Sequence, residues 1–516
     1  MNTTKKAIVI GTGAGGLMSA AYLSKYGFEV VALEKAPSIG GYLKSFSSKG
    51  YHFDPGIHYM GECSPGQMVH RILSDLGLDA DDLFCEMDPE CIDIYRFPDL
   101  EIKLCKGIDA YRDRLAEQFP NEIEGIDRFV DSINKVRVVR NMVNTFVYSS
   151  PALSDLPLMA KIPLYLPFLT RSGRNDYATF LQSITSDIKL QAVLSGLLGC
   201  IGVPPSQASS LLALLLFLHF IDGGFFPKGG GSGLRDAIVG AAERNGAVFR
   251  TRADVSKISL KDGMATGVVL ADGEEIEADV VVACVDPVIT FGRFIEHSNL
   301  PAGLRKKVVN IKPSLSIYYV FLGIKRDLSK YGLGPFNIWE FPTYDMEELY
   351  RDALNGKLVD PKGIMISPNS LKDTSGKLAP EGGSVLEFLT FAPYEPFSKW
   401  EELPSKKRGS EYEDFKNRYG ELILDRIKQK YPDFLGDIEI KIFATPLTNA
   451  HWVNAVKGGI YGPAMSKDQT LWSRFKTRTP FKNLYLAGSG VIGAGVASCL
   501  MSGVVAADIV KKQLGT

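Results

Sequence analysis

The chain has 516 residues, of which 45% are hydrophobic and 23% are charged. This composition is close to that of soluble globular proteins and excludes a disordered, collagen-like or polytopic membrane protein. The 58 Lys and Arg against 59 Asp and Glu give a net charge of −1. That balance argues against nucleic-acid binding, because proteins that bind nucleic acids usually carry a basic excess. At ~150 residues per domain, the length favours two to four domains.

The cysteines and the N-terminus indicate the compartment. The seven cysteines are an odd number and include no CxxC pair, so neither a disulfide framework nor a zinc or other metal site is expected. Residues 1–6 lack the apolar stretch and cleavage site of a signal peptide. We therefore expect a cytoplasmic protein.

The N-terminal residues are typical of a βαβ unit. Apolar residues 6–10 predict a strand, and a helix that ends near Tyr26 is expected after the glycine-rich residues 11–16. Gly27 is placed to end that helix. Residues 29–34 predict a second, buried parallel strand.

From residue 60 to residue 220 the pattern is mainly helical, with two apolar runs at 151–168 and 211–221. Neither run reaches the ~18–20 uncharged residues that a membrane-spanning helix needs. Two interpretations stay open. The runs are helices of a large core, or residues 151–168, which prolines interrupt repeatedly, form an apolar surface lip that dips into a bilayer.

The rest of the chain returns to strands and glycine turns. Residues 227–234 predict a glycine-rich turn, 234–245 a helix, and 247–285 a small antiparallel β unit that rejoins the parallel sheet. Strands are expected at 314–325 and 385–392, and charged helices within 399–431. A strand at 483–488 and a helix of small residues at 495–512 close the chain.

The turn at residues 11–16 is a G-x-G-x-x-G fingerprint of dinucleotide binding. Gly11 allows the tight turn after the strand, Gly13 lets the backbone approach a pyrophosphate, and Gly16 lets the helix pack closely on the sheet. The pyrophosphate is expected at the helix N-terminus, where free N–H groups favour anions. Glu34 ends the second strand, where a carboxylate can accept both hydroxyls of an adenosine ribose. The fingerprint alone does not separate FAD from NAD.

The segment Pro37-Ser-Ile-Gly-Gly-Tyr-Leu-Lys-Ser45 follows the acidic residue directly. Here the sequence resembles the family of FAD-dependent amine oxidases and carotenoid desaturases, in which a Gly-Gly pair wraps the FAD pyrophosphate. The resemblance implies that role for Gly40 and Gly41. This chain has Ser38 and Tyr42 where the family often has Arg, which weakens the case for an amine oxidase or a typical phytoene desaturase.

The C-terminal segment resembles the second FAD signature of the same family. It runs from Leu484-Tyr-Leu-Ala-Gly-Ser489 through Gly495-Val496. The resemblance implies a helix N-terminus at the flavin N1/O2 edge, where N–H groups stabilise the anionic reduced flavin. Most members have Asp or Glu where Ser489 stands, which leaves its contact with the ribitol open. The segment 226–230 also resembles the carotenoid desaturases and implies a backbone contact of Val255 with the adenine.

Residues 50–61, Gly-Tyr-His-Phe-Asp-Pro-Gly-Ile-His-Tyr-Met-Gly, resemble the retinol saturase and carotenoid isomerase branch, and are closer to the saturases. The resemblance implies that His58 and Tyr59 are candidate catalytic residues, although a packing role for His58 is equally open. His219 and Cys499 are expected to be buried packing residues, and His451 and Trp452 line either the substrate tunnel or the core. The residues expected to bind FAD are Gly11, Gly13, Ala14, Gly15, Gly16, Glu34, Lys35, Gly40, Gly41, Tyr42, Val255, Gly488, Ser489, Gly495 and Val496.

The predicted fold is a doubly wound, Rossmann-type α/β FAD-binding domain with an inserted α+β substrate domain. The expected segments are 1–90, 221–298 and 446–516 for FAD binding, and 91–220 and 299–445 for the substrate. The resemblance implies a saturase or desaturase acting on carbon–carbon bonds of an apolar polyene or isoprenoid such as a retinoid or carotenoid. NAD(P)H or another electron donor or acceptor, peripheral membrane contact and the oligomeric state stay open.

Three other functions remain compatible with the sequence: redox-neutral cis–trans isomerisation of a polyene, reductive cyclisation of a polyene, and non-catalytic lipid binding by a flavoprotein.

Overall fold

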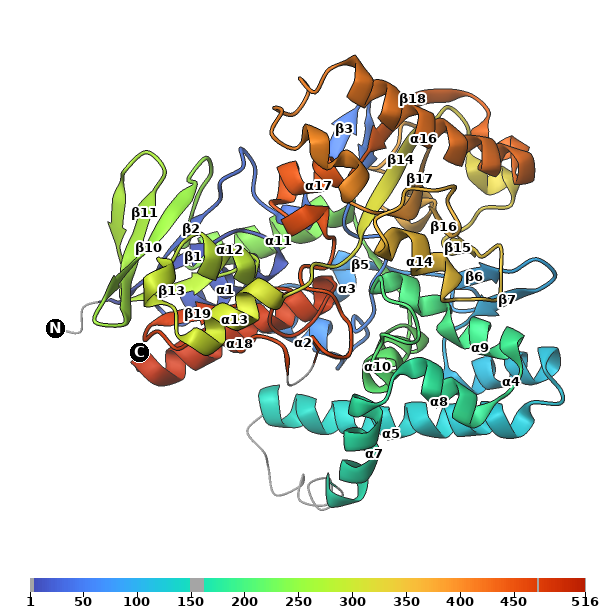
Figure 1. The fold of residues 1–516 in the computed structure, drawn as a ribbon, viewed down its shortest axis with the longest axis horizontal. Coiled ribbons are helices and arrows are strands. Elements are labelled where there is room, and N and C mark those ends of the chain that lie inside the picture. Colours follow the sequence, from blue (N-terminus) through green and yellow to red (C-terminus); the bar gives the residue numbers. More distant parts are fainter. Residues whose placement is uncertain (1–3, 149–161, 471–472, 516) are drawn as a thin grey trace.

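In this computed structural model, which describes residues 4–148, 162–470 and 473–515, short strands from distant parts of the chain form a parallel sheet (Figure 1). Its strands are β1 Lys6–Ile10, β2 Glu29–Leu33, β9 Val248–Arg250, β13 Val280–Ala283 and β19 Leu484–Leu486. Their order is β19-β13-β1-β2-β9, and every neighbouring pair is parallel. The strand order therefore reverses at β1, which creates a crevice at the carboxyl ends of β1 and β13.

Two different layers cover this sheet, because alternate side chains of each strand point to opposite faces. Ala7, Val9 and Val282 pack against the helices α1 Ala14–Lys25, α11 Gly230–Arg244 and α18 Val496–Leu514. Ile8 and Val281 pack on the other side, against a three-stranded antiparallel sheet and neighbouring residues. That sheet is formed by β10 Val255–Lys261, β11 Met264–Leu270 and β12 Glu275–Glu277. The predicted α/β fold and its small antiparallel unit are confirmed.

The start of α11 corrects one prediction. The glycines at 230, 231 and 233 were expected in a turn, but they belong to the helix. Gly229 and Gly230 have φ of +72° and +71°, a conformation that glycine adopts without a steric penalty. The carboxylate of Asp54 lies at this helix end and accepts a hydrogen bond from the Gly231 N–H at 2.9 Å. A partner distant in the sequence therefore stabilises the first turn, which no local pattern reveals.

A second sheet, which has seven strands, lies beside the parallel sheet and its covering layers (Figure 1). Its order is β18-β14-β17-β16-β15-β6-β7, and β6 and β15 are the one parallel pair of neighbours among its described strands. The strands are β6 Asp93–Arg96, β7 Glu101–Leu104, β14 Ser316–Ile324, β15 Asn337–Glu340, β16 Ile364–Ser367, β17 Ser384–Ala392 and β18 Ile438–Ala444. Helix α16 Ser410–Lys430 packs on β14 and β18. Two further sheets have two strands each: β3 Phe46–Ser48 pairs with β4 Tyr51–Phe53, and β5 Phe84–Glu86 pairs with β8 Phe225–Pro227.

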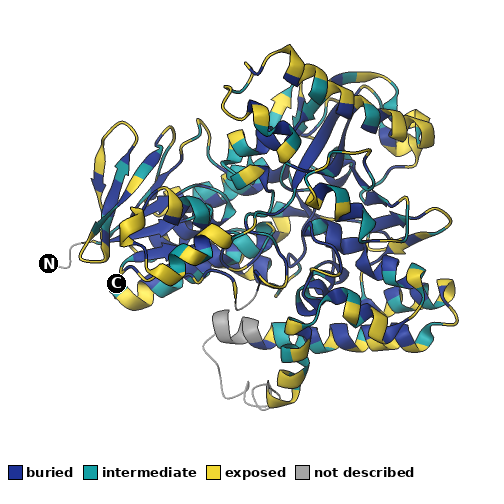
Figure 2. Cartoon of the chain, in the orientation of Figure 1, coloured by how far each residue is buried: buried dark blue, intermediate teal, exposed yellow. Residues whose placement is uncertain are grey.

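Helices from residues 108–221 form the third part, at the bottom of Figure 1. They are α4 Ile108–Gln118, α5 Ile123–Tyr148, α7 Ile162–Arg174, α8 Tyr177–Ile184, α9 Ile188–Ser195 and α10 Ser210–Ile221. Helix α10 contacts α5, α7 and α8 and is mostly buried, so the apolar run at 211–221 is a core helix. Figure 2 shows α7 as largely exposed. No helix in the described ranges has the length and apolarity needed to span a membrane.

Seven short α-helices lie between the elements named above in the described ranges. The short α-helices are α2 Met68–Asp75, α3 Ala80–Leu83, α12 Pro287–Gly292, α13 Ala302–Asn310, α14 Glu348–Leu354, α15 Asn369–Lys372 and α17 Pro446–Val453.

Candidate functional site

One cavity of about 820 Å³ joins the crevice of the parallel sheet to the second sheet and to the helical part. Its walls come from the turn after β1, from the loop at 55–60, from α10 and from the turn after β19. Among the predicted cofactor-binding residues, the following line it: Gly11, Gly13, Ala14, Gly15, Glu34, Lys35, Gly41, Tyr42, Val255, Gly488, Ser489, Gly495 and Val496. Gly16 and Gly40 are buried and are not part of the lining.

The glycines of the first turn have different surroundings. A Cβ added at Gly13 would meet no heavy atom of the described residues within 4 Å, so this backbone borders open space. A Cβ at Gly16 would lie 1.9 Å from the Gly11 carbonyl oxygen, and one at Gly15 would lie 2.8 Å from the Gly488 nitrogen. Gly16 is therefore required by helix–strand packing, and Gly15 by the approach of the C-terminal turn. Gly13 leaves a cradle at the N-terminus of α1, where free N–H groups favour an anion.

Thr12, in the turn after β1, forms hydrogen bonds with Glu34 and with the Gly40-Gly41 segment. Its hydroxyl donates to Glu34 Oε2 at 2.6 Å, and its Oγ1 accepts a hydrogen bond from the Gly40 N–H at 3.2 Å. Glu34 Oε1 accepts from the Ala36 N–H at 2.9 Å. Glu34 Oε2 also accepts from the Thr12 N–H at 3.2 Å, so three of the about four acceptor sites of the carboxylate are used. The carboxylate is thereby fixed at the cavity wall and can accept from one further hydroxyl group of a ligand.

A second acid, Asp286, lines the cavity near the C-terminal turn that carries Ser489. A Cβ added at Gly462 would lie 2.6 Å from Ser489 Oγ and 3.8 Å from Asp286 Oδ2, so both side chains approach the backbone of Gly462. Asp286 follows β13 and uses Oδ1 to accept from the Val288 N–H at 2.8 Å. Burial raises the pKa of its carboxyl group. Next to them, Gly495 is the N-cap of α18 and lines the same cavity.

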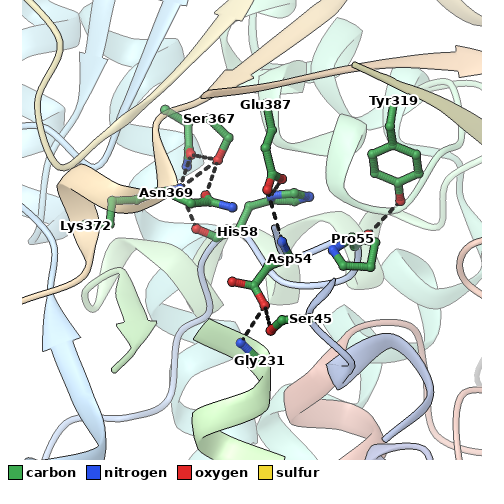
Figure 3. Close-up of polar contacts among 11 residues, drawn as sticks. Ser45, Asp54, Pro55, His58, Gly231, Tyr319, Ser367, Asn369, Lys372 and Glu387 are labelled. Carbon is green, nitrogen blue, oxygen red and sulfur yellow. Dashed lines mark hydrogen bonds and ion pairs between the residues drawn. The ribbon is translucent and has the colours of Figure 1, made fainter. Parts of the chain in front are cut away.

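The loop that carries His58 and Tyr59 lies on a buried polar network, drawn in Figure 3. His58 Nδ1 is 3.3 Å from Glu387 Oε2, and burial lowers the pKa of His58 to about 3. Burial raises the pKa of Glu387 well above its ordinary value. The imidazole is therefore neutral at pH 7 and lies beside a Glu387 whose carboxyl group is held protonated. Among the described residues neither His58 Nδ1 nor Glu387 Oε2 has a hydrogen-bond partner. His58 lines the cavity, while Glu387 lies behind it.

Asp54 and Lys372 complete this network, and both side chains are almost fully buried (Figure 3). Asp54 Oδ1 accepts from the Ser45 hydroxyl at 2.5 Å, and burial raises its pKa to about 6. Lys372 Nζ donates to the His58 carbonyl oxygen at 2.7 Å and to Ser367 Oγ at 2.7 Å. Burial lowers the pKa of Lys372 to about 7. The network thus fixes the backbone of His58 and holds several groups that titrate near neutrality.

Tyr59 connects the network to the cavity. Its hydroxyl donates to Asp93 Oδ2 at 2.8 Å, and it lies 3.3 Å from Cys200 Sγ. Asp93 Oδ1 accepts from the Asn337 amide at 3.0 Å, and Asn337 Oδ1 accepts from Lys372 at 2.8 Å. Burial raises the pKa of Asp93 to about 6. A hydrogen-bonded chain therefore runs from Lys372 to a hydroxyl at the cavity wall.

The rest of the wall is apolar and aromatic. It includes Trp339, Phe341, Tyr350, Leu389 and Phe391. The Tyr59 ring stacks on Phe220, with the ring centroids 4.3 Å apart. Most of the exposed lining is apolar, so a long hydrophobic molecule fits here better than a charged one.

The other residues considered from sequence divide between cavity and packing roles. Trp452 and Cys499 line the cavity, and burial raises the pKa of Cys499 to about 12, which leaves the thiol unreactive. His451 lines a separate surface pocket. His219 also lines the main cavity, and its Nε2 accepts from the Gly61 N–H at 2.8 Å.

Sequence reasoning missed Thr12, Asp93, Asp286, Lys372 and Glu387. Asp286 was within reach, because it directly follows a predicted parallel strand, and ligands bind at the carboxyl ends of such strands. Lys372 and Glu387 stand in no motif, and only the folded chain brings them to His58.

Comparison with known proteins gives consistent results. Residues 14–511 match the family described as flavin containing amine oxidoreductase. All-trans-retinol 13,14-reductase from Danio rerio is 27% identical over 528 residues, which cover 98% of this chain and 85% of that protein. Prolycopene isomerase 2 from an Oncidium hybrid cultivar is 29% identical over 522 residues, covering 99% and 84%. The crystal structure of an oxidoreductase from Methanosarcina mazei has the same fold, with a TM-score of 0.62, 18% identity and coverage of 96% and 98%.

Proposed function

Because the chain belongs to the flavin containing amine oxidoreductase family, we propose that it is an FAD-dependent enzyme that reduces a carbon–carbon double bond of an apolar polyene. The observation that supports this most is the continuous cavity, which joins the glycine cradle after β1 to an apolar chamber. The names of the similar proteins, an all-trans-retinol 13,14-reductase and a prolycopene isomerase, support a retinoid or carotenoid substrate.

The residues present fit FAD. The open backbone at Gly13 and the N-terminus of α1 would hold the pyrophosphate, and Glu34 would accept from the adenosine ribose. Ser489 and Asp286 would bind ribitol hydroxyls, so Asp286 replaces the acid that the family often has at position 489. The N-terminus of α18 would stabilise negative charge on the flavin. When bound and reduced, FAD supplies a hydride.

A second hydrogen has to reach the substrate as a proton, and we propose that the Tyr59 hydroxyl donates this proton. In the structure the Tyr59 hydroxyl donates to Asp93 Oδ2, and we propose that this hydrogen bond reverses when Asp93 is protonated. The Asp93 carboxylic acid then donates to the Tyr59 oxygen, and the Tyr59 hydroxyl proton moves to the neighbouring carbon of the double bond. Hydride and proton together give the two hydrogens of a saturated bond, and Asp93 is left as a carboxylate. Its raised pKa, about 6, keeps a protonated fraction available near neutrality. His58 and Glu387 position the loop that carries Tyr59.

The apolar aromatic wall orients the polyene and keeps water away from the reacting bond. We propose that the polyene enters the cavity next to α7. Leu164 and Leu166 of this helix are 76% and 53% exposed, and Leu169 of the same helix lines the cavity. We propose that this face rests on a membrane surface and admits substrate from the lipid. Of the apolar run at 151–168, residues 151–161 lie outside the described residues.

Product mass tests the function. FAD-loaded protein is incubated anaerobically with retinol or a carotene and a chemical reductant, and the product is analysed by mass spectrometry. The proposal expects a gain of two hydrogens that requires both FAD and the reductant. The physiological electron donor is proposed to be NAD(P)H or another carrier. Protein heated before the assay is the control.

Isomerisation is the second candidate, because the isomerase relative matches almost the whole chain. It would give a product of unchanged mass and a different retention time. If neither change occurs while the polyene binds, the protein is a lipid-binding flavoprotein.

A further inference from the structure

A group of polar side chains interrupts the apolar cavity wall where α5 and α10 approach the loop after Tyr59. Glu62, Arg140 of α5 and His219 of α10 all line the cavity. The wall around them is built from leucines, among them Leu212 and Leu216. The proposed chemistry at Tyr59 does not use these three groups, although Glu62 is three residues away from it.

The charges in this group are already balanced. Arg140 Nη1 donates to Glu62 Oε1 at 2.7 Å, and Arg140 Nη2 donates to Asp222 Oδ2 at 3.0 Å. Arg137 donates to the other oxygen of Asp222 at 2.8 Å. Two guanidinium groups therefore face two carboxylates. Glu62 and Arg140 are only 8% and 16% exposed, so a further charge here would lack the compensation that water gives.

His219 contributes a directed donor. Its Nε2 accepts from the Gly61 N–H, so the proton of the neutral ring is on Nδ1. Burial lowers the pKa of His219, which keeps the ring neutral. Within the described part of the chain, the one hydrogen bond of the His219 ring is that at Nε2, so the Nδ1–H stays available to a ligand. The wall thus presents one N–H donor and one carboxylate acceptor side by side, in an apolar setting.

We propose that Glu62 and His219 bind the terminal hydroxyl of a linear polyene alcohol, with Arg140 holding Glu62 in place. The hydroxyl donates to the Glu62 carboxylate and accepts from the His219 Nδ1–H. This assignment rests on the proposed function and names the substrate class of the same site. A hydrocarbon end would cover both groups without replacing their hydrogen bonds to water, which is costly. A carboxylate end would add a third negative charge beside Glu62 and Asp222.

Equilibrium binding to the oxidised, FAD-loaded protein tests this without turnover. The probes are retinol, the corresponding carboxylic acid, and the hydrocarbon in which hydrogen replaces the hydroxyl. Binding is followed by quenching of tryptophan fluorescence, since Trp339 lines the cavity. The variants are His219→Phe and Glu62→Gln. Arg137→Gln is the matched control, because Arg137 pairs with the same Asp222 but is not part of the cavity lining. Flavin absorbance of each variant shows that it is folded and loaded.

We expect wild type to bind the alcohol at least about tenfold more tightly than the hydrocarbon or the acid, the scale of one hydrogen bond to a charged group. Both variants should lose most of that preference while their affinity for the hydrocarbon stays unchanged, and Arg137→Gln should keep it. Equal binding of alcohol and hydrocarbon by wild type, or tightest binding of the acid, overturns the assignment alone. Equal loss of alcohol and hydrocarbon affinity in the variants also overturns it. If none of the three probes binds, the proposed function itself fails.

Discussion

Replacing Gly13 with alanine should weaken FAD binding at least about tenfold without disturbing the fold. Gly13 has φ of −65° and ψ of 178°, which alanine adopts readily, and a methyl group there would meet no described atom within 4 Å. The free energy of unfolding of the apo-protein should therefore stay within about 1 kcal/mol of the wild-type value. Replacing a glycine gives a small gain in stability, and replacing it at a helix N-cap gives a small loss.

The effect on the cofactor should be much larger. The added methyl group occupies the space in which the pyrophosphate would approach the backbone N–H groups of α1. Each hydrogen bond to a charged group contributes about 1.5–3 kcal/mol, so the loss of one or two corresponds to a Kd at least about tenfold weaker. Gly16→Ala is the matched contrast. Its methyl group would lie 1.9 Å from the Gly11 carbonyl oxygen, which should destabilise even the apo-protein by about 1–3 kcal/mol.

Thermal unfolding of the apo-proteins and titration with FAD, followed by flavin fluorescence, separate the two effects. The reasoning predicts that Gly13→Ala changes the Kd and not the Tm, and that Gly16→Ala lowers the Tm. Wild-type affinity in Gly13→Ala would show that the pyrophosphate does not use this cradle. Denaturation of the wild-type holoprotein should release free FAD, since we expect no covalent link.

Three further predictions concern the substrate side. Tyr59→Phe should lower kcat at least about tenfold with little change in FAD content. The kcat of wild type should fall as the pH rises above about 6, because Asp93 then loses its proton. A kcat that stays constant between pH 5 and 8 would contradict this role of Asp93. His58→Ala should lower turnover more than FAD occupancy, and unchanged activity per folded molecule would leave only a packing role. Wild type should float with liposomes at both low and high salt, since hydrophobic docking is insensitive to screening by salt, and the double variant Leu164→Glu/Leu166→Glu should float less. Equal flotation of wild type and variant would argue that α7 does not dock on a membrane.

The nucleotide-binding half of the fold could be predicted because its signals are local. Residues 6–34 contain strand, glycine turn, helix, stop and acidic residue in order, and β1, α1 and β2 form where expected. The same holds for the strand and turn before α18. In these segments the spacing of apolar and glycine residues is dictated by close backbone approaches, such as that of Gly16 to Gly11, and it is therefore visible in the sequence.

The polar network could not be predicted, because its members come from positions 54, 58, 372 and 387 and meet only through tertiary packing. Glu387 lies in the apolar strand β17, where sequence alone gives no reason to expect a buried acid. Asp54 was visible only as part of the family-like segment, and its contact with the N-terminus of α11 was not. Long-range pairs of this kind leave no periodic trace.

The position of these charges has a physical reason. An apolar polyene offers no charged group to bind, so ionised side chains in contact with it would lose hydration without compensation. In the structure Asp54, Lys372 and Glu387 lie behind the cavity wall and act on it through the backbone and ring of His58. Tyr59 presents a neutral hydroxyl instead of the Asp93 carboxyl group. The part of the wall formed by His58 and Tyr59 therefore carries no ionised side chain, while titratable groups with pKa values near 6 and 7 stand one hydrogen bond away from it. Glu62 and Arg140, which do line the cavity, neutralise each other as an ion pair.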